Sequence, residues 1–270
     1  MTGGALIRLG LFAVVLAAVA AAAALVGRAS GIEADAEPAE TAGAMGHAEA
    51  PAEPHETEPA GLALEQDGYR LTVEREALTA GRAEEFVFRI LDAEGADARE
   101  FELEHERLLH LVIVARPPHA HFLHLHPRQR ADGAWTVPVR LPANGSYRVF
   151  ADFTTGGERR TLGIDLVGSG GPETAPEEVT AHDVALDARG ERLAFGVRAE
   201  GRPVELQPYL GALGHLVVIR EGDFGYVHAH AEEDELAFDV PFPTPGRYRL
   251  YLQYQADGRV ETVRFTRTVA

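Results

Sequence analysis

The second half of this 270-residue chain repeats the first half, and this repeat constrains the fold more than any other feature. The offsets between matched blocks are 105, 104 and 101 residues and change only between blocks, as small deletions in loops would produce. Such self-similarity predicts two copies of one module, residues 61–167 and 179–270, joined by a Gly/Pro-rich acidic linker at 168–178. The blocks are LHLVIV (109–114) with GHLVVI (214–219), FLHLH (122–126) with YVHAH (226–230), and GSYRVF (145–150) with GRYRLY (246–251).

Each module consists of short runs that are typical of strands. Apolar side chains alternate with period two in the segments around Leu71, Phe88, Val149 and Leu250. Turn pairs such as Asn144-Gly145 separate these runs, and no stretch after residue 28 sustains a helical period. The prediction is an all-β chain with two tandem immunoglobulin-like antiparallel β-sandwich modules after an N-terminal transmembrane or signal helix.

The N-terminal segment indicates export. Arg8 precedes an uncharged apolar run over residues 9–27, so residues 1–29 are expected to be a cleaved signal peptide or a signal anchor. The protein would then be a single-pass membrane protein with extracytoplasmic domains, or secreted if the signal is cleaved. Residues 30–60 are rich in Ala, Pro and Glu and predict a disordered acidic linker, in which His47 and His55 are interpreted as solvated.

Composition excludes several kinds of chemistry. The chain has no Cys and no Lys, and its only methionines are Met1 and Met45. Disulfides, thiolate nucleophiles, iron–sulfur clusters, blue-copper sites and Schiff bases are therefore excluded, and a thioether Cu(I) site is not expected. The formal net charge of −17 argues against a nucleic-acid partner.

The histidines carry the predicted chemistry. Because residues i and i+2 of a strand share a face, the two histidines of each HxH pair project together. A hairpin centred near residue 117 would place His110 opposite His124, and His215 would lie opposite His228 or His230. Opposed Cβ atoms lie about 5 Å apart, so three imidazoles can reach one ion. The predicted metal ligands are His110, His124 and His126 in the first module and His215, His228 and His230 in the second.

Three neutral imidazoles without a thiolate favour Cu(II) or Zn(II). Asp152 could add a fourth ligand in the first module, although its repeat counterpart is Gln253 and the site does not require it. The other histidines of the modules lack repeat counterparts: His105 is expected to be exposed, His119 and His121 to widen the first site as loop residues, and His182 has no assigned role.

A structural role for the same histidines stays open. The alternate faces of their strands carry residues such as Leu111 and Leu216, so the strands are expected to be central in their sheets. Neutral histidines buried there could form hydrogen bonds that hold sheets or modules together. The chain would then be a scaffold or interaction protein with structural or pH-sensing histidines.

The segments HLVIV, FLHLHP and GSYRVFADF, which begin at His110, Phe122 and Gly145, carry a resemblance to known proteins. They resemble the exported histidine-rich proteins of high-GC bacteria called heavy-metal-binding secreted proteins, and more loosely the YtkA-like and copper-resistance C-type sandwich domains. The resemblance covers residues 61–270 and implies an extracytoplasmic immunoglobulin-like fold with a link to metal export. This chain departs from the pattern at Ala231, which stands where the first module has Pro127.

Together these features predict an extracytoplasmic divalent-metal protein that buffers metal or carries it to a metal-transporting membrane protein. An enzyme is not expected, because the serines are confined to Ser30, Ser146 and Ser169, in linkers or a turn, and no repeated carboxylate accompanies the histidine pairs. A metal-dependent hydrolase or oxidase remains the second alternative.

Overall fold

A computed structural model describes residues 60–117, 121–174, 180–231 and 235–270. All of these residues belong to one compact unit, Glu56–Ala270. The predicted N-terminal helix and nearly all of the predicted acidic linker lie outside the described residues. No helix in the described part of the chain is both long and apolar enough to cross a membrane.

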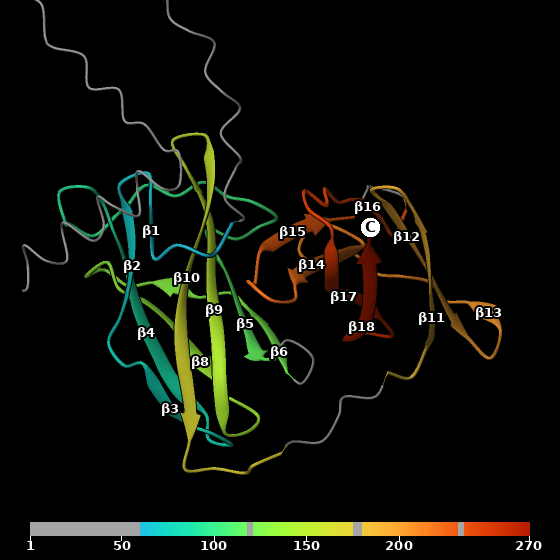
Figure 1. The fold of residues 1–270 in the computed structure, drawn as a ribbon, viewed down its shortest axis with the longest axis horizontal. Coiled ribbons are helices and arrows are strands. Elements are labelled where there is room, and N and C mark those ends of the chain that lie inside the picture. Colours follow the sequence, from blue (N-terminus) through green and yellow to red (C-terminus); the bar gives the residue numbers. More distant parts are fainter. Residues whose placement is uncertain (1–59, 118–120, 175–179, 232–234) are drawn as a thin grey trace, which may run out of the picture. The chain divides into compact units, whose positions relative to one another are not determined.

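The first module is a sandwich of two five-stranded sheets (Figure 1). Their strand orders are β1-β2-β4-β8-β7 and β3-β10-β9-β5-β6. Pairing is antiparallel throughout, except that β3 lies parallel to β10. The first sheet comprises β1 (Glu65–Gln66), β2 (Tyr69–Val73), β4 (Glu84–Leu91), β7 (Arg128–Gln129) and β8 (Trp135–Val139), and the second β3 (Ala77–Thr79), β5 (His110–Arg116), β6 (Phe122–Leu125), β9 (Gly145–Thr155) and β10 (Glu158–Ser169).

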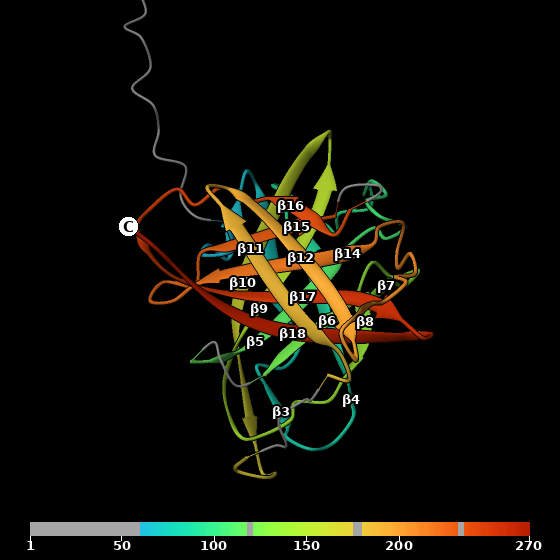
Figure 2. The ribbon, with the colours of Figure 1, turned by 90° about the vertical axis from the view of Figure 1, so that its right-hand side faces the viewer.

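The second module has a sheet in which β12 pairs with β11, β13 and β16, and a sheet with the order β15-β14-β17-β18. Figure 2 views this module with β11 and β12 in front of β14 and β17. The strands are β11 (Asp183–Arg189), β12 (Arg192–Ala199), β13 (Arg202–Pro203) and β16 (Ala237–Asp239), then β14 (Gly214–Arg220), β15 (Tyr226–His230), β17 (Gly246–Ala256) and β18 (Arg259–Val269). The all-β prediction of two tandem β-sandwich modules is confirmed.

The repeated blocks form the same sheet in both modules, with β6-β5-β9-β10 corresponding to β15-β14-β17-β18. We call these two sheets the histidine sheets. The expectation that the histidine strands are central is right for β5 and β14, but β6 and β15 are edge strands of their sheets. Strand β10 continues through Ser169, two residues into the segment predicted as the linker.

Both faces of β5 and β14 are buried. The inner faces contribute residues such as Ile113 and Val218 to the separate core of each sandwich. The outer faces pack together in one apolar cluster, which we call the inter-module cluster. It explains why the strand sequences are apolar at successive positions, as expected for strands covered on both sides. The cluster comprises Val112, Val114, Phe122, Phe150, Val217, Ile219, Phe224, Tyr226 and Tyr251.

Candidate metal centre

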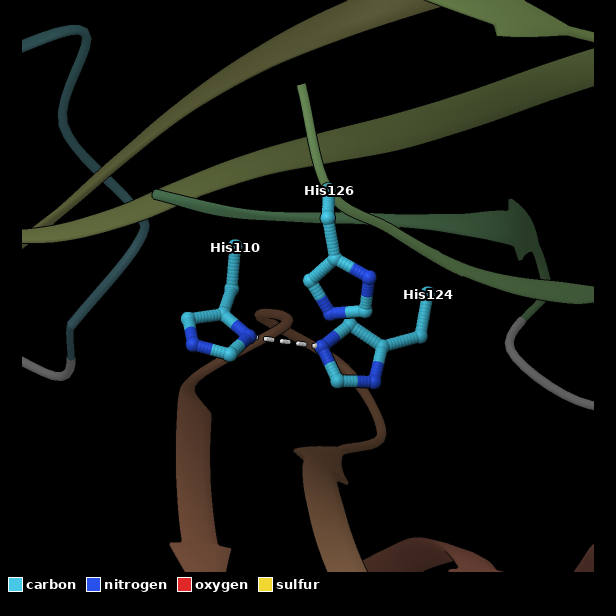
Figure 3. Close-up of side chains that lie close together, drawn as sticks. All are labelled: His110, His124 and His126. Carbon is cyan, nitrogen blue, oxygen red and sulfur yellow. Dashed lines mark hydrogen bonds between the residues drawn. The ribbon is translucent and has the colours of Figure 1, made fainter. Parts of the chain in front are cut away.

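The three predicted histidines of the first module come together at one end of the β5–β6 hairpin (Figure 3). His110 begins β5, His124 lies on β6, and His126 follows two residues later. One ring nitrogen from each histidine lies within 4.8 Å of the others. His110 and His124 are buried or nearly so, and His126 is half-buried.

The second module repeats this arrangement. His215 lies on β14, and His228 and His230 lie on β15. Their candidate ligand nitrogens also lie within 4.8 Å of one another. His215 pairs directly with His230, one of the two predicted registers.

The predicted register of the first hairpin is wrong by two residues. Val112, and not His110, pairs with His124, so the hairpin is centred one residue later than expected. Continued in this register, His110 faces position 126. A two-residue shift along the strand keeps every side chain on its face, so the three histidines still converge.

Two equivalent loops orient the first histidine of each triplet. The Nε2 atom of His110 lies 3.3 Å from the Glu104 carbonyl oxygen, and that of His215 lies 2.9 Å from the Tyr209 carbonyl oxygen. A carbonyl can only accept a hydrogen bond, so Nε2 carries the proton in both rings. The Nδ1 atom of each ring therefore presents a lone pair.

The second histidine of each triplet is oriented by a residue of the other module. The Nδ1 atom of His124 donates to Oε1 of Gln253 at 2.8 Å, and that of His228 donates to Oδ2 of Asp152 at 3.0 Å. Asp152 and Gln253 occupy equivalent places, because Asp152 pairs with His110 in the sheet and Gln253 pairs with His215. Asp152 is thus an orienting residue for the second triplet and lies outside the first ligand group.

The ring nitrogens that remain are the candidate metal ligands. His215 Nδ1 and the Nε2 atoms of His126, His228 and His230 are buried without a hydrogen-bond partner. The two others, His110 Nδ1 and His124 Nε2, face each other at 3.0 Å. This contact is a hydrogen bond when one of the two nitrogens carries a proton (Figure 3), whereas the tautomers in which the oxygens of Glu104 and Gln253 accept from the opposite ring nitrogens leave both nitrogens free for a cation.

Burial keeps these imidazoles neutral, the form that binds metal. It lowers the pKa of His110, His124 and His215 to about 4 and that of His126 to about 2. Burial also lowers the pKa of His228 and of His230.

Asp152 is ionised although it is only 1% exposed. Burial alone would raise its pKa, but the Arg159 guanidinium outweighs burial and holds the pKa well below its usual range. Arg159 binds both carboxylate oxygens, with Nε 2.9 Å from Oδ1. Asp152 can therefore accept the proton of His228 Nδ1 as a carboxylate.

The other histidines divide into three cases. His105 is half-buried, contrary to expectation, and stacks on His230 with ring centroids 3.5 Å apart. His182 forms a hydrogen bond with the Tyr254 hydroxyl at 3.1 Å and belongs to neither triplet. His121 lies outside both ligand groups, and His119 is outside the described residues.

Sequence reasoning missed three contributions: those of Gln253 to the first triplet, and of Asp152 and His105 to the second. Gln253 and Asp152 could have been singled out from the sequence, because they are polar residues at equivalent positions of the repeat. His105 could not, since its counterpart is Leu210.

The donor set fits a small divalent ion. Metal–imidazole bonds are about 2.0–2.1 Å long, so two nitrogens on a tetrahedral ion lie about 3.3 Å apart. The 3.0 Å separation of His110 Nδ1 and His124 Nε2 is close to this value. Hydrogen bonds from ligand rings to carbonyl or carboxylate oxygens are the usual outer support of metal-bound histidine.

The fold and the histidine groups define the class: a two-module β-sandwich protein with one buried three-histidine cluster per module. Within that class, the chain belongs to the family DUF8832, a domain of unknown function, whose model matches residues 64–167 and 176–270. No curated protein matches the chain.

Several solved structures are similar to this chain at low identity. A two-domain fibronectin type III segment of chicken tenascin is 9% identical, with 74% of this chain and 97% of that chain covered and a TM-score of 0.23. The Escherichia coli adhesin FdeC is 13% identical, with 77% and 66% covered and a TM-score of 0.27. InvD of Yersinia pseudotuberculosis is 10% identical, with 75% and 58% covered and a TM-score of 0.27.

Proposed function

We propose that the protein binds divalent metal outside the cytoplasm, one ion per three-histidine group, and buffers the metal or passes it to a metal-transporting membrane protein. The observation that carries the proposal is the orientation of six buried or half-buried imidazoles. Each ring directs one nitrogen into its group. In His126, His215, His228 and His230 that nitrogen has no hydrogen-bond partner, and in His110 and His124 the two nitrogens contact each other. The other nitrogen of the first two rings of each group is hydrogen-bonded to an oxygen outside the group. Purely structural histidines would be expected to use both nitrogens in hydrogen bonds.

The donor chemistry supports Cu(II) or Zn(II). Neutral imidazole suits both ions, and the affinity order of divalent metals favours Cu(II) where both are available. The extracytoplasmic location is supported by the apolar run over residues 9–27, which would also attach the chain to the membrane if it is not cleaved. The acidic net charge of −17 supports a cationic cargo and no nucleic-acid partner.

A binding role is proposed in preference to catalysis. Asp152, the carboxylate hydrogen-bonded to a triplet, already accepts hydrogen bonds from Arg159, Thr161 and His228. It is therefore poorly placed to act as a general base, which must be free to take a proton from substrate or water.

Calorimetric titration of the full chain, purified without an affinity tag, tests the proposal. We expect saturation near two equivalents of Zn(II) or Cu(II), and loss of both binding events in the double variant His110→Ala/His215→Ala. The variant His182→Ala is the matched control, because it removes a histidine outside both groups, and it should bind two equivalents. Wild-type-like binding by the double variant would rule the proposal out.

A further inference from the structure

The two histidine triplets lie against each other. Within the first triplet, ring centroids are 4.8–5.2 Å apart. Between the triplets, the His228 ring lies 5.0 Å from His110 and 5.0 Å from His124. The His228 ring is therefore as close to two rings of the first triplet as those rings are to each other, while other pairs of rings between the triplets lie 5.7–6.3 Å apart. Ions bound to the two triplets would be neighbours.

The contacts around the triplets are reciprocal. Phe122 stacks on Tyr251 with centroids 4.4 Å apart, and Phe150 stacks on Tyr226 at 4.6 Å. In the repeat, Phe122 corresponds to Tyr226 and Phe150 to Tyr251, so each contact is the other with the modules exchanged. The hydrogen bonds from His124 to Gln253 and from His228 to Asp152 are exchanged in the same way. The interface is thus self-complementary about a pseudo-two-fold axis, and this symmetry brings equivalent rings together.

Charge and coordination number indicate what the two ions would share. Three neutral imidazoles leave a fourth position open on a tetrahedral ion, and each candidate group consists of histidine alone. The nearby carboxylate of Asp152 is already neutralised by Arg159. Two adjacent divalent ions would repel each other strongly in this buried setting unless an anion lay between them.

We propose that the two triplets form a single binuclear centre between the modules, in which two divalent ions share a small bridging anion such as hydroxide. This inference rests on the metal binding proposed above and adds that the two sites are one unit. Two-metal sites of this kind hold their ions about 3.5–4 Å apart.

Electron paramagnetic resonance of the full chain loaded with Cu(II) tests the proposal. We compare the wild type with the matched variants His110→Ala/His126→Ala and His215→Ala/His230→Ala, each of which removes equivalent ligands from one triplet. His182→Ala serves as the control for loss of a histidine elsewhere. Spectra are recorded at one and two equivalents, and circular dichroism checks the fold of each variant.

Two neighbouring Cu(II) ions should give a half-field line, or a signal well below two spins per chain, in the wild type and in His182→Ala at two equivalents. Each single-triplet variant should give the ordinary spectrum of an isolated Cu(II). A full two-spin signal without a half-field line in the wild type would overturn the binuclear centre and leave metal binding intact, whether or not the variants fold. Saturation at one equivalent would also overturn it, because the six histidines would then share one ion. Absence of binding would instead refute the proposed function on which it rests.

Discussion

At the scale of single residues, the two triplets differ in what supports them. His228 donates to the carboxylate of Asp152, whereas His124 donates to the neutral amide of Gln253. Asp152 is in turn bound by Arg159, whose repeat counterpart is the exposed Val260. An imidazole that donates a hydrogen bond to a carboxylate is a stronger metal ligand than one that donates to an amide. The second triplet should therefore hold its ion more tightly.

The variant Asp152→Asn should weaken metal binding at the second triplet about 10–100-fold, because His228 would lose its carboxylate partner. Binding at the first triplet should weaken less. Zn(II) titration calorimetry resolves the two events, and the two single-triplet variants assign them. Asp187→Asn, which alters an exposed aspartate on β11, is the control. Equal weakening at both triplets, or none, would contradict the assigned role of Asp152.

The sequence was sufficient to predict all six ligand candidates, because HxH spacing within a strand fixes a shared face locally. It aligned Asp152 with Gln253 but could not predict the orienting role of Asp152 or the position of His105. Both depend on contacts with the other module, at His228 and His230. Contacts between modules follow from docking, which no local pattern encodes.

At the scale of secondary-structure elements, β5 and β14 each pack on both faces. Their inner faces complete the two sandwich cores, and their outer faces carry the histidines and the inter-module cluster. The apolar runs predicted central strands, which is right for these two. The edge positions of β6 and β15 could not be foreseen, because their outer faces are covered by the opposite module and not by a further strand.

The variant Tyr251→Ala should destabilise the protein by about 3–5 kcal/mol, the usual cost of deleting a large buried aromatic ring. It should also weaken metal binding at both triplets, since Tyr251 stacks on Phe122 beside the shared interface. Chemical denaturation and Zn(II) titration measure the two effects.

Phe195→Ala provides the comparison, because it removes an aromatic ring from the core of the second module alone. A variant of Tyr251 that unfolds more easily but binds Zn(II) as Phe195→Ala does would show that the inter-module cluster is not coupled to the metal groups.

At the scale of the whole molecule, the histidines make the metal-free protein sensitive to acid. The pKa of His110, His124 and His215 is about 4 in the folded chain, against an ordinary value of 6.5. Between these values the unfolded chain binds more protons than the folded one. The contribution of these neutral histidines to the free energy of unfolding is therefore complete above pH 6.5 and is lost as the pH falls towards 4.

We expect the free energy of unfolding in a chelator to fall between pH 7.5 and pH 5, by up to about 1.4 kcal/mol per pH unit for each buried histidine. Urea denaturation at several pH values measures this slope. The variant His126→Ala/His230→Ala should show a shallower slope, because it lacks two of the groups. A stability that is constant over this interval would contradict the burial argument.

The reciprocal pairing of the modules has a consequence for how the two sites can differ. In a homodimer built on the same two-fold axis, one substitution would alter both metal groups at once. Here the two halves are joined in one chain, so Asp152 and Gln253 can occupy equivalent places with different chemistry. Two modules joined in one chain can therefore combine one site that binds its ion tightly with one that exchanges its ion readily, as the proposed buffering and delivery of metal would require.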